Sequence, residues 1–468
     1  MIETRQQRFT ESINKALDHQ AHKDTPQLFS YTEKIAGVEE INPIAVFQYT
    51  QSFKGARFFW TSPEDGVILI GLGSVCQFKE NKTNGDRFEQ VHSEWKDLLK
   101  SIYIDNPYNQ PGTGPVMMGG FSFDPEESSE LWENYPSSQM TLPEYIITID
   151  DSDAYLTCHI RLDGQADIEN GRASFTQMIE TMKKDPQQGA KDPECISQQE
   201  KSAEEWKETV RSATERIENR QMNKVVLARE LRVSFNHSIP VSKVLENLLE
   251  QQKQSYIFAV ESGEDCFIGA TPERLVKVEN GELLSTCLAG TSPRGETPQE
   301  DEVLGKELLY DEKNRMEHAF VVDMIKQAVE ACSDHVEVPE SPVLYKLRNL
   351  QHLYTPVRGR LREGHSLLEV VRSLHPTPAM GGVPREEALS FIKDEEQADR
   401  GWYSAPIGWM DAMDNGEFAV AIRSGLIQKN EASLFAGCGI VKDSDPEKEF
   451  RETQIKFSPM LMALGGLQ

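Results

Sequence analysis

Short apolar runs recur along this chain, and they predict β-strands. Runs of about four to eight apolar or alternating residues between turn residues are typical of strands. Before residue 183 these runs are Ala56 to Trp60, Gly66 to Leu72, Val116 to Phe123 and Glu144 to Asp150. After residue 201 they are Lys224 to Val233, Tyr256 to Glu261, Cys266 to Gly269, Phe418 to Ile427 and Ala432 to Ile440. A hairpin is predicted at Asn280 and Gly281, because this pair suits a tight turn between strands.

Helical spacing enters in the second half of the chain. Ser202 and Glu205 form a capping-box pattern that predicts a helix start. The apolar residues that follow at helical intervals are Trp206, Val210, Ala213 and Ile217. Further helices are predicted around Glu307 to Cys332 and Ser366 to Leu374. Helices mixed with antiparallel hairpins predict an α+β fold, a large layered, sheet-rich structure with helices packed outside.

One stretch, from Lys183 to Lys201, separates the two halves. It is rich in Pro, Gln, Lys, Asp and Glu, which is typical of a surface linker or long loop. We therefore divide the chain into a strand-rich part, residues 1–195, and a second part, residues 200–466, that carries the chemistry below. We expect the two parts to form one compact unit.

The chain is strongly acidic, with a formal net charge of -27 over 468 residues. Nucleic acids and acidic membranes need a basic surface, so neither is an expected partner. The N-terminus has no apolar signal-peptide core, and no apolar run approaches the length of a membrane span. The seven cysteines are scattered without a CxxC pair, which is typical of reduced thiols. We expect a cytoplasmic protein.

The strongest chemical pattern lies on a predicted helix near the C-terminus. Asp445 and Pro446 suit its N-cap and first turn. Glu449, Glu452 and Lys456 follow at offsets of three and four, which places them on one face. Two acids and a lysine on one stripe suit a hard metal ion together with an anionic ligand. An exposed helix with spaced charges would show the same pattern.

A further acid, Glu317, lies in the predicted helix that ends at Cys332. It shares a helical stripe with Val321, Met324 and Ala328, so its carboxylate would lie on a core-facing surface. A buried carboxylate is usually paired, protonated or bound to a metal. A magnesium ion shared with the C-terminal helix would satisfy it, because the candidate ligands are oxygens only. A half-exposed position at the helix edge is the equal alternative.

Three charged residues lie at or near strand ends. Lys224 begins a strand that is apolar on both faces, where burial would lower its pKa and make it a base; the alternative is a lysine that reaches solvent. Glu273 lies at a turn, as a site acid or a solvated residue. Arg423 lies in an apolar strand, where it should be buried and paired with a carboxylate of the protein or of a ligand. Backbone amides near Gly439 could contact an anion.

These residues fall in motifs that together resemble the chorismate-utilising enzymes. The resemblance covers about Ser202 to Leu464. The motifs are KVVLAR (Lys224 to Arg229), GATPERL (Gly269 to Leu275), LAGT (Leu288 to Thr291), MEH (Met316 to His318), QHL (Gln351 to Leu353), HPTPAMGG (His375 to Gly382), AIRSG (Ala421 to Gly425), AGCGIV (Ala436 to Val441) and ExxExxxK (Glu449 to Lys456).

The resemblance implies a role for each site residue. Lys224 would be the base that activates water toward ring carbon 2 of chorismate, and Glu273 the acid that protonates the departing 4-hydroxyl. Magnesium would be held by Glu317 and Glu452, with Glu449 beside them. The expected substrate contacts are Gly290, Thr291 and Lys456 for the ring carboxylate, Tyr403, Arg423 and Gly439 for the enolpyruvyl carboxylate, and His352 near the ring. One departure from the motifs is Asn314, where some relatives have an acid.

Product choice within the family depends on Ala379. Family members that go on to eliminate pyruvate tend to have threonine at the corresponding position. Alanine at this position therefore implies isochorismate synthase activity, which is an isomerase reaction. A menaquinone pathway is expected, and the alternatives are a siderophore pathway, a salicylate or anthranilate synthase, and a chorismate-binding protein without catalysis. A non-catalytic protein would need no acid and base on opposite sides of a ring. No obligatory protein partner is evident.

Overall fold

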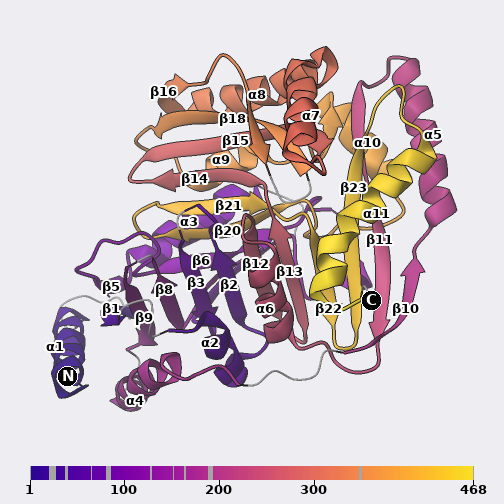
Figure 1. Ribbon diagram of the computed structural model, residues 1–468. Coiled ribbons are helices and arrows are strands. Elements are labelled where there is room, and N and C mark those ends of the chain that lie inside the picture. Colours follow the sequence, from indigo (N-terminus) through magenta and orange to yellow (C-terminus); the bar gives the residue numbers. More distant parts are fainter. Residues whose placement is uncertain are drawn as a thin grey trace.

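The computed structural model describes residues 2–20, 28–36, 41–64, 66–80, 86–126, 129–150, 152–162, 165–187, 193–346 and 350–466, and its core consists of two large sheets (Figure 1). The described strands of the larger sheet number 13. In order across it they are β10 (Cys195–Glu200), β11 (Lys224–Phe235), β23 (Glu431–Ile440), β22 (Ser424–Gln428), β13 (Asp265–Thr271), β12 (Tyr256–Ser262), β2 (Arg57–Thr61), β3 (Ile68–Leu72), β8 (Tyr145–Ile149), β9 (Ala154–Arg161), β1 (Leu28–Ala36) and β5 (Ile102–Asp105), with β19 (Gly382–Val383) beside β11.

The second sheet has 10 described strands. In order they are β16 (Ser333–Glu337), β18 (Leu350–Leu361), β15 (Glu282–Pro293), β14 (Arg274–Glu279), β21 (Gly416–Val420), β20 (Pro406–Asp411), β6 (Val116–Phe121), β7 (Ser138–Leu142) and β4 (Cys76–Glu80), with β17 (Val343–Lys346) paired to β18. An aromatic cluster that includes Trp60, Phe267, Trp402 and Trp409 fills the space between the sheets.

Helices cover the outer faces of both sheets. Apolar side chains of α1 (Ile2–Gln20), α2 (Pro43–Tyr49), α4 (Gln165–Met182), α6 (Val241–Gln251) and α11 (Pro446–Ala463) join one core with the larger sheet. Those of α3 (Arg87–Leu99), α8 (Glu312–Cys332) and α9 (Leu367–Leu374) join a second core with the smaller sheet. The same core includes α5 (Ala203–Glu218) and α10 (Arg385–Glu395), which pack against β11 of the larger sheet. The remaining helical elements are α7 (Pro298–Tyr310) and the 3-10 turns Gln51–Phe53 and Glu130–Trp132. The α+β, layered architecture predicted from the sequence is confirmed.

Both sheets mix strands from the two parts of the chain defined above. In the larger sheet β2 pairs with β12, and in the smaller sheet β6 pairs with β20. The predicted linker contains strand β10, which pairs with β11, while residues 188–192 lie outside the described part. The fold therefore distributes residues 1–195 and 200–466 over common sheets rather than over separate layers.

Three local predictions were wrong. Ser202 has a left-handed backbone with φ of 48° and makes no side-chain cap, so the capping box does not form. The predicted helix from Glu307 to Cys332 is interrupted at Asp311, whose side chain caps α8 instead. The predicted strand from Phe418 to Ile427 is two strands, β21 and β22, because the backbone turns between them at Arg423, where φ is 52°.

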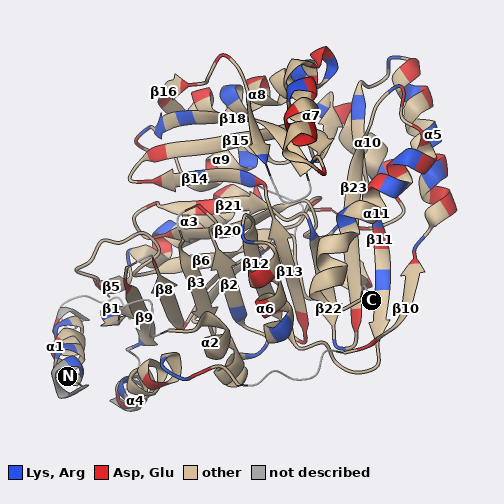
Figure 2. Cartoon of the chain, viewed as in Figure 1, with Lys and Arg blue, Asp and Glu red and all other residues tan. Residues whose placement is uncertain are grey.

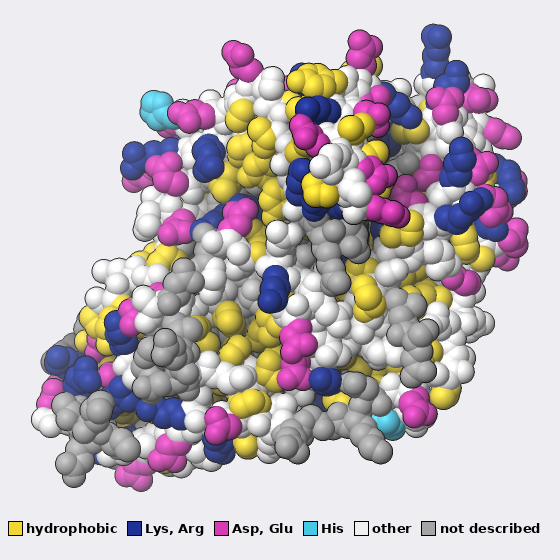
Figure 3. Space-filling model, viewed as in Figure 1, with side chains coloured by type: hydrophobic (Ala, Val, Ile, Leu, Met, Phe, Trp, Pro, Cys, Tyr) yellow, Lys and Arg dark blue, Asp and Glu magenta, His cyan; other side chains and the backbone are white. Residues whose placement is uncertain are grey.

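No helix in the described ranges combines the length and the hydrophobicity that crossing a bilayer requires. Figure 2 shows acidic and basic residues interspersed along the outer helices. Figure 3 shows the same mixture of charge on this face of the surface, with hydrophobic side chains between the charged ones.

A buried ion pair between β2 and β12 ties the early and late parts of the chain together. Arg57 and Glu261 form two contacts of 2.6 and 2.7 Å, and both side chains are 3% exposed. Removing one partner of a buried pair leaves the other charge uncompensated, at a cost of about 3–5 kcal/mol. We expect Glu261→Ala to lower the free energy of unfolding by that amount in urea denaturation.

Glu264 provides the matched control, because its ion pair with Lys54 lies on the surface. The Glu264 side chain is 68% exposed and that of Lys54 is 50% exposed. Exposed pairs contribute about 0–1 kcal/mol, so Glu264→Ala should have a small effect. Equal losses in the two variants would contradict a structural role for the buried pair.

Candidate active site

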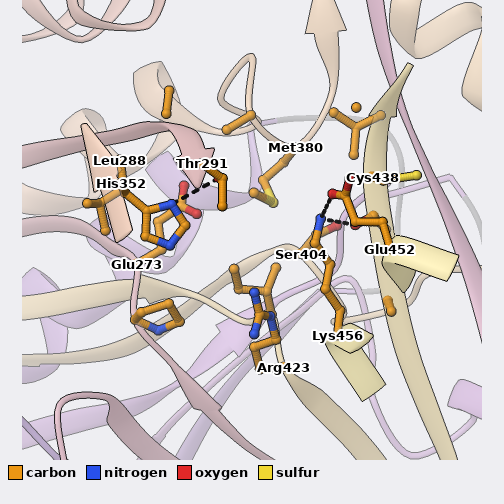
Figure 4. Close-up of a pocket in the computed structure, with 18 of the residues that line it drawn as sticks. Glu273, Leu288, Thr291, His352, Met380, Ser404, Arg423, Cys438, Glu452 and Lys456 are labelled. Atoms are coloured by element: carbon orange, nitrogen blue, oxygen red, sulfur yellow. Dashed lines mark hydrogen bonds and ion pairs between the residues drawn. The ribbon is translucent and has the colours of Figure 1, made fainter. Parts of the chain in front are cut away.

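One cavity of about 280 Å³ collects the chemical motifs of the sequence. It lies where ends of strands from both sheets meet the first turns of α8 and the middle of α11 (Figure 4). Of the predicted site residues, those that line it are Lys224, Glu273, Gly290, Thr291, Glu317, His352, Ala379, Tyr403, Arg423, Gly439, Glu452 and Lys456. Lys224 and Lys456, the first and last of these residues, are far apart in the sequence. They therefore come together only in the folded chain.

The amine of Lys224 contacts the carboxylate of Glu317. Their side chains are 15% and 31% exposed, so both face the cavity without being sealed from solvent. The buried stripe of α8 runs through Val321, Ile325 and Val329. Glu317 continues this stripe one turn before Val321, but it is half-exposed and faces Lys224, which agrees with the half-exposed alternative and not with a core position.

Glu452 and Lys456 face the cavity from α11, one helical turn apart. Asp445 caps this helix as predicted, through a hydrogen bond from the Lys448 amide. Lys456 Nζ lies 2.7 Å from Glu452 and donates to the carbonyl of Gly437 at 2.8 Å. The carbonyl contact holds the ammonium group over the end of β23, where Figure 4 shows it pointing into the cavity.

Glu449 is the one predicted site residue that does not line the cavity. It lies toward Ser444 and Cys438, and burial raises its pKa. Its position on the helix is one turn before Glu452, so the two carboxylates share a helix face but not the cavity wall.

Glu273 is a carboxyl group whose pKa is raised above its ordinary value. Burial raises its pKa to about 7, although Lys224, Arg423 and Lys456 act in the opposite direction. It follows that a substantial fraction of Glu273 is protonated near neutral pH, and that it can donate a proton into the cavity.

Arg423 is a cation at the cavity wall, for which the sequence predicts a carboxylate partner from the protein or from a ligand. No carboxylate among the described residues lies within ion-pair distance of its guanidinium group, and burial lowers its pKa. Tyr403 lies nearby and stacks on Phe435 with ring centroids 5.4 Å apart. A desolvated guanidinium group that faces a cavity is suited to an anionic ligand.

The opposite wall is formed by β15 and β18. His352 Nδ1 and Thr291 Oγ1 are 3.0 Å apart, as Figure 4 shows. Burial, with Arg423 nearby, lowers the pKa of His352 to about 4, so the imidazole is neutral at physiological pH. It can therefore offer one donor and one acceptor without adding charge to the cavity.

Two glycines are required by their surroundings. Gly290 has φ of 80° at the irregularity between β15 and β18, a conformation that other residues adopt at a cost. A Cβ atom on Gly439 would lie 2.7 Å from Cε of Lys224. The glycine at position 439 thus leaves the space through which the lysine side chain reaches the cavity.

Sequence reasoning missed a buried ion pair behind the cavity. Arg400 donates to both carboxylate oxygens of Glu396 at 2.6 and 2.7 Å, to the carbonyl of Val226 at 2.7 Å and to that of Met380 at 3.0 Å. Glu396 also accepts the amide of Ala228 at 2.8 Å. The signal in the sequence was an acid and an arginine four residues apart. Here the pair is 3% and 2% exposed rather than on the surface.

The oxygen donors of the cavity can be compared with the needs of a metal ion. Within the described ranges no group of three or more His, Cys, Asp or Glu side chains is close enough to hold a metal by itself. Glu317 and Glu452 are the carboxylates that face the cavity beside Glu273. Magnesium is commonly bound by one or two carboxylates, with waters and substrate oxygens completing its shell, so this donor set fits that ion better than zinc.

Comparisons with known proteins agree with the geometry. A family model described as chorismate binding enzyme matches residues 11–465. Isochorismate synthase MenF of Bacillus subtilis (strain 168) is 42% identical over 477 aligned positions, which cover 100% of this chain and 99% of that protein. The salicylate biosynthesis isochorismate synthase of Pseudomonas aeruginosa is 34% identical over 97% of this chain and 94% of its own. The solved structure of MenF, the menaquinone-specific isochorismate synthase from Escherichia coli, has a TM-score of 0.78 at 23% identity, covering 97% of this chain and 99% of that one, which shows a shared fold.

The raised pKa of Glu273 makes stability depend on pH. Between the ordinary value of 4.5 and about 7, the unfolded chain loses this proton while the native protein keeps it, so native stability falls as the pH rises through that window. Glu273→Gln removes the effect. At about 1.4 kcal/mol for each pKa unit, the variant should gain up to about 3 kcal/mol relative to the unmutated protein between pH 4.5 and 7.5. Urea denaturation at each pH measures this, with Glu282→Gln as an exposed control; a constant difference would contradict the assignment.

Proposed function

The chain belongs to the chorismate-binding enzyme family, and we propose that it is a magnesium-dependent isochorismate synthase, which converts chorismate to isochorismate. The observation that carries the proposal is one cavity in which a protonatable carboxyl, Glu273, and an amine, Lys224, accompany the unpaired guanidinium group of Arg423. An acid and a base together can exchange one hydroxyl group for another on a ring. Full-length similarity to an isochorismate synthase supports this reaction over others of the family.

In the proposed reaction, water adds to ring carbon 2 while the hydroxyl group on carbon 4 leaves. Lys224 is the group that accepts a proton from the attacking water. The two ring double bonds shift by one position, and the bond from carbon 4 to oxygen breaks. Glu273 gives its proton to the departing oxygen, so one water is consumed and one is released. The raised pKa of Glu273 supports this role, because a general acid should titrate near the working pH.

Both carboxylates of chorismate find complementary groups on the cavity wall. We assign the enolpyruvyl carboxylate to Arg423 with Tyr403 and Gly439, since Arg423 has no carboxylate partner in the described part of the chain. The ring carboxylate is assigned to Lys456, Gly290 and Thr291. His352 is neutral and lies beside Thr291, where it can orient the ring without competing for either anion.

Magnesium would be held by Glu317 and Glu452, and when bound it would supply positive charge to the ring carboxylate. In its absence Lys224 and Lys456 contact these two carboxylates. Glu449 does not line the cavity, so we assign it to the surroundings of Glu452 rather than to the ligands.

The pathway proposed for the product is menaquinone biosynthesis, because the relative with 42% identity shares the name MenF with the Escherichia coli enzyme that is described as menaquinone-specific. A siderophore or salicylate route is the alternative, supported by the 34% identity to a salicylate biosynthesis enzyme. Incubation of purified protein with chorismate and magnesium, followed by chromatography and a pyruvate assay, tests the reaction. Isochorismate without pyruvate is expected, and stoichiometric pyruvate would contradict the proposal.

Loss of the acid or the base should slow turnover without unfolding the protein. Positioned proton transfer contributes roughly 10²–10⁴-fold, so Lys224→Ala and Glu273→Gln should each reduce kcat by that factor. Because Glu273 acts while protonated, kcat/KM should fall as the pH rises above about 7. Near-normal turnover in either variant, with circular dichroism unchanged, would show that the role is misassigned.

Removal of magnesium should abolish turnover, because two carboxylates and the substrate carboxylate would then repel one another. Glu317→Gln and Glu452→Gln should each abolish activity and weaken magnesium-dependent binding of chorismate, measured by calorimetry. Glu449→Gln is the matched control on the same helix and should retain magnesium binding. Full activity in excess chelator would disprove the metal requirement.

Ala379 should decide whether the reaction stops at isochorismate. Its methyl group offers no hydrogen bond to the ring, whereas threonine adds a hydroxyl group at the cavity wall. We expect Ala379→Thr to slow isochorismate release or to raise pyruvate formation, and Ala379→Val to control for the added bulk. Identical product ratios in all three proteins would remove position 379 from product choice.

A further inference from the structure

A second cavity lies behind the loop that carries Ala379. It has a volume of about 340 Å³ and is bounded by the first turn of α3, the segment after β6, the end of α9 and one face of α10. His375 and Pro376 form part of its wall, and the same loop continues to the active-site cavity with Ala379 and Met380. The loop 375–382 is thus shared by two cavities.

Positive charge gathers in this second cavity although the whole chain is acidic. Its charged wall residues are the cations Arg87, Arg372, Arg385 and Lys393 and the acids Asp86 and Asp124. Two of the cations are neutralised, since Arg372 contacts Asp86 and Lys393 Nζ lies 2.5 Å from Glu126. The other two arginines, opposed by the single remaining acid Asp124, determine what the cavity can bind.

Arg87 is a buried cation whose hydrogen-bond partners are neutral groups, while the carboxylates of Asp124 and Asp86 act on it from farther away. It is 7% exposed and donates to the hydroxyl and carbonyl of Ser122 at 2.7 and 2.9 Å and to the carbonyl of Ser137 at 2.8 Å. In the described ranges no carboxylate lies within ion-pair distance of it, so Asp124 and Asp86 offset its charge only in part. A buried cation without a carboxylate in contact is costly, so an anion that enters beside it would be stabilised.

Arg385 lies at the opening of the same cavity, at the first position of α10. One guanidinium nitrogen donates to the carbonyl of His375, and none of the described carboxylates forms an ion pair with this side chain. The helix begins here without a side-chain cap, and Glu386 and Glu387 in its first turn offset its positive end, so the local positive charge comes from the arginine side chain. The fork of an arginine is suited to a carboxylate.

The rest of the wall is apolar, which limits the class of anion. Phe88, Phe123, Pro376, Leu389 and Ile392 line it between the two arginines. Inorganic phosphate would leave these surfaces uncovered, whereas an apolar ring would bury them.

We propose that this cavity binds a small aromatic or alicyclic carboxylate. The ring lies against the apolar wall, and its carboxylate is bound by Arg385 in the field of Arg87. Occupancy restrains the loop 375–382, because Arg385 holds the carbonyl of His375. A second link runs through Phe123, whose ring lies 4.2 Å from the guanidinium carbon of Arg400, which in turn donates to Met380.

Calorimetry with benzoate as the probe tests the site. The unmutated protein should bind benzoate, and Arg385→Gln should weaken binding by about tenfold or more, since charge-assisted hydrogen bonds are lost. Arg423→Gln, in the active-site cavity, and Arg172→Gln, an exposed cation on α4, should each change it by less than about twofold. Absence of benzoate binding would overturn the proposal. So would a loss in Arg423→Gln with none in Arg385→Gln, because benzoate would then bind at the active site.

Two further measurements test the apolar wall and the loop. Inorganic phosphate should bind more weakly than benzoate, and equal or tighter phosphate binding would overturn the assignment to an organic carboxylate. Hydrogen exchange should slow in peptides covering residues 375–382 when benzoate is added to the unmutated protein but not to Arg385→Gln. Unchanged exchange in both would overturn the link to the loop.

Discussion

The buried ion pair between Arg400 and Glu396 is the interaction on which the catalytic cavity depends. It joins three segments that have no sheet pairing with one another at this point: strand β11, the loop after α9, and the turn that carries Tyr403. On the edge of β11 away from β23, the Val226 amide still donates to the carbonyl of Gly381, and β10 pairs only from Leu231 onward. Between these points the carbonyl of Val226 and the amide of Ala228 have no strand partner. Arg400 and Glu396 satisfy both of these groups. Breaking such a pair on one side costs about 3–5 kcal/mol, which is a large part of the stability of a typical domain.

The cavity gathers positive charge although the molecule as a whole is acidic. A chain with a net charge of -27 holds Lys224, Arg423 and Lys456 around one space. Desolvation then has opposite effects on acids and bases, raising the pKa of Glu273 and lowering that of Arg423. An acidic exterior would slow the approach of an anionic substrate, so affinity has to come from this local field.

The sequence was sufficient for several features that depend on residues near one another in the chain, although the capping box at Ser202 did not form. The N-cap at Asp445, the apolar face of α5 and the hairpin at Asn280 were all predicted, because each is decided by spacing or by local backbone preference. The family motifs then predicted which residues would form the site. Contacts between distant segments could not be predicted in this way. The pairing of Lys224 with Glu317, the position of Glu449 off the cavity and the turn at Arg423 all follow from how strands and helices pack, which periodicity does not encode.

The mixing of early and late strands in both sheets constrains how this protein is made. Strand β2 finds its neighbour β12 about 200 residues later in the chain, as in the pairing of Phe58 with Val260. Pairings of such high contact order form slowly, because the entropy cost of closing a long loop comes before any stabilising contact forms. During synthesis, the edge of β2 that pairs with β12 therefore stays uncovered until the second half of the chain has left the ribosome. Free sheet edges are sites of aggregation, so the yield of native protein should depend on chaperones and on translation speed more than on the stability of the finished fold.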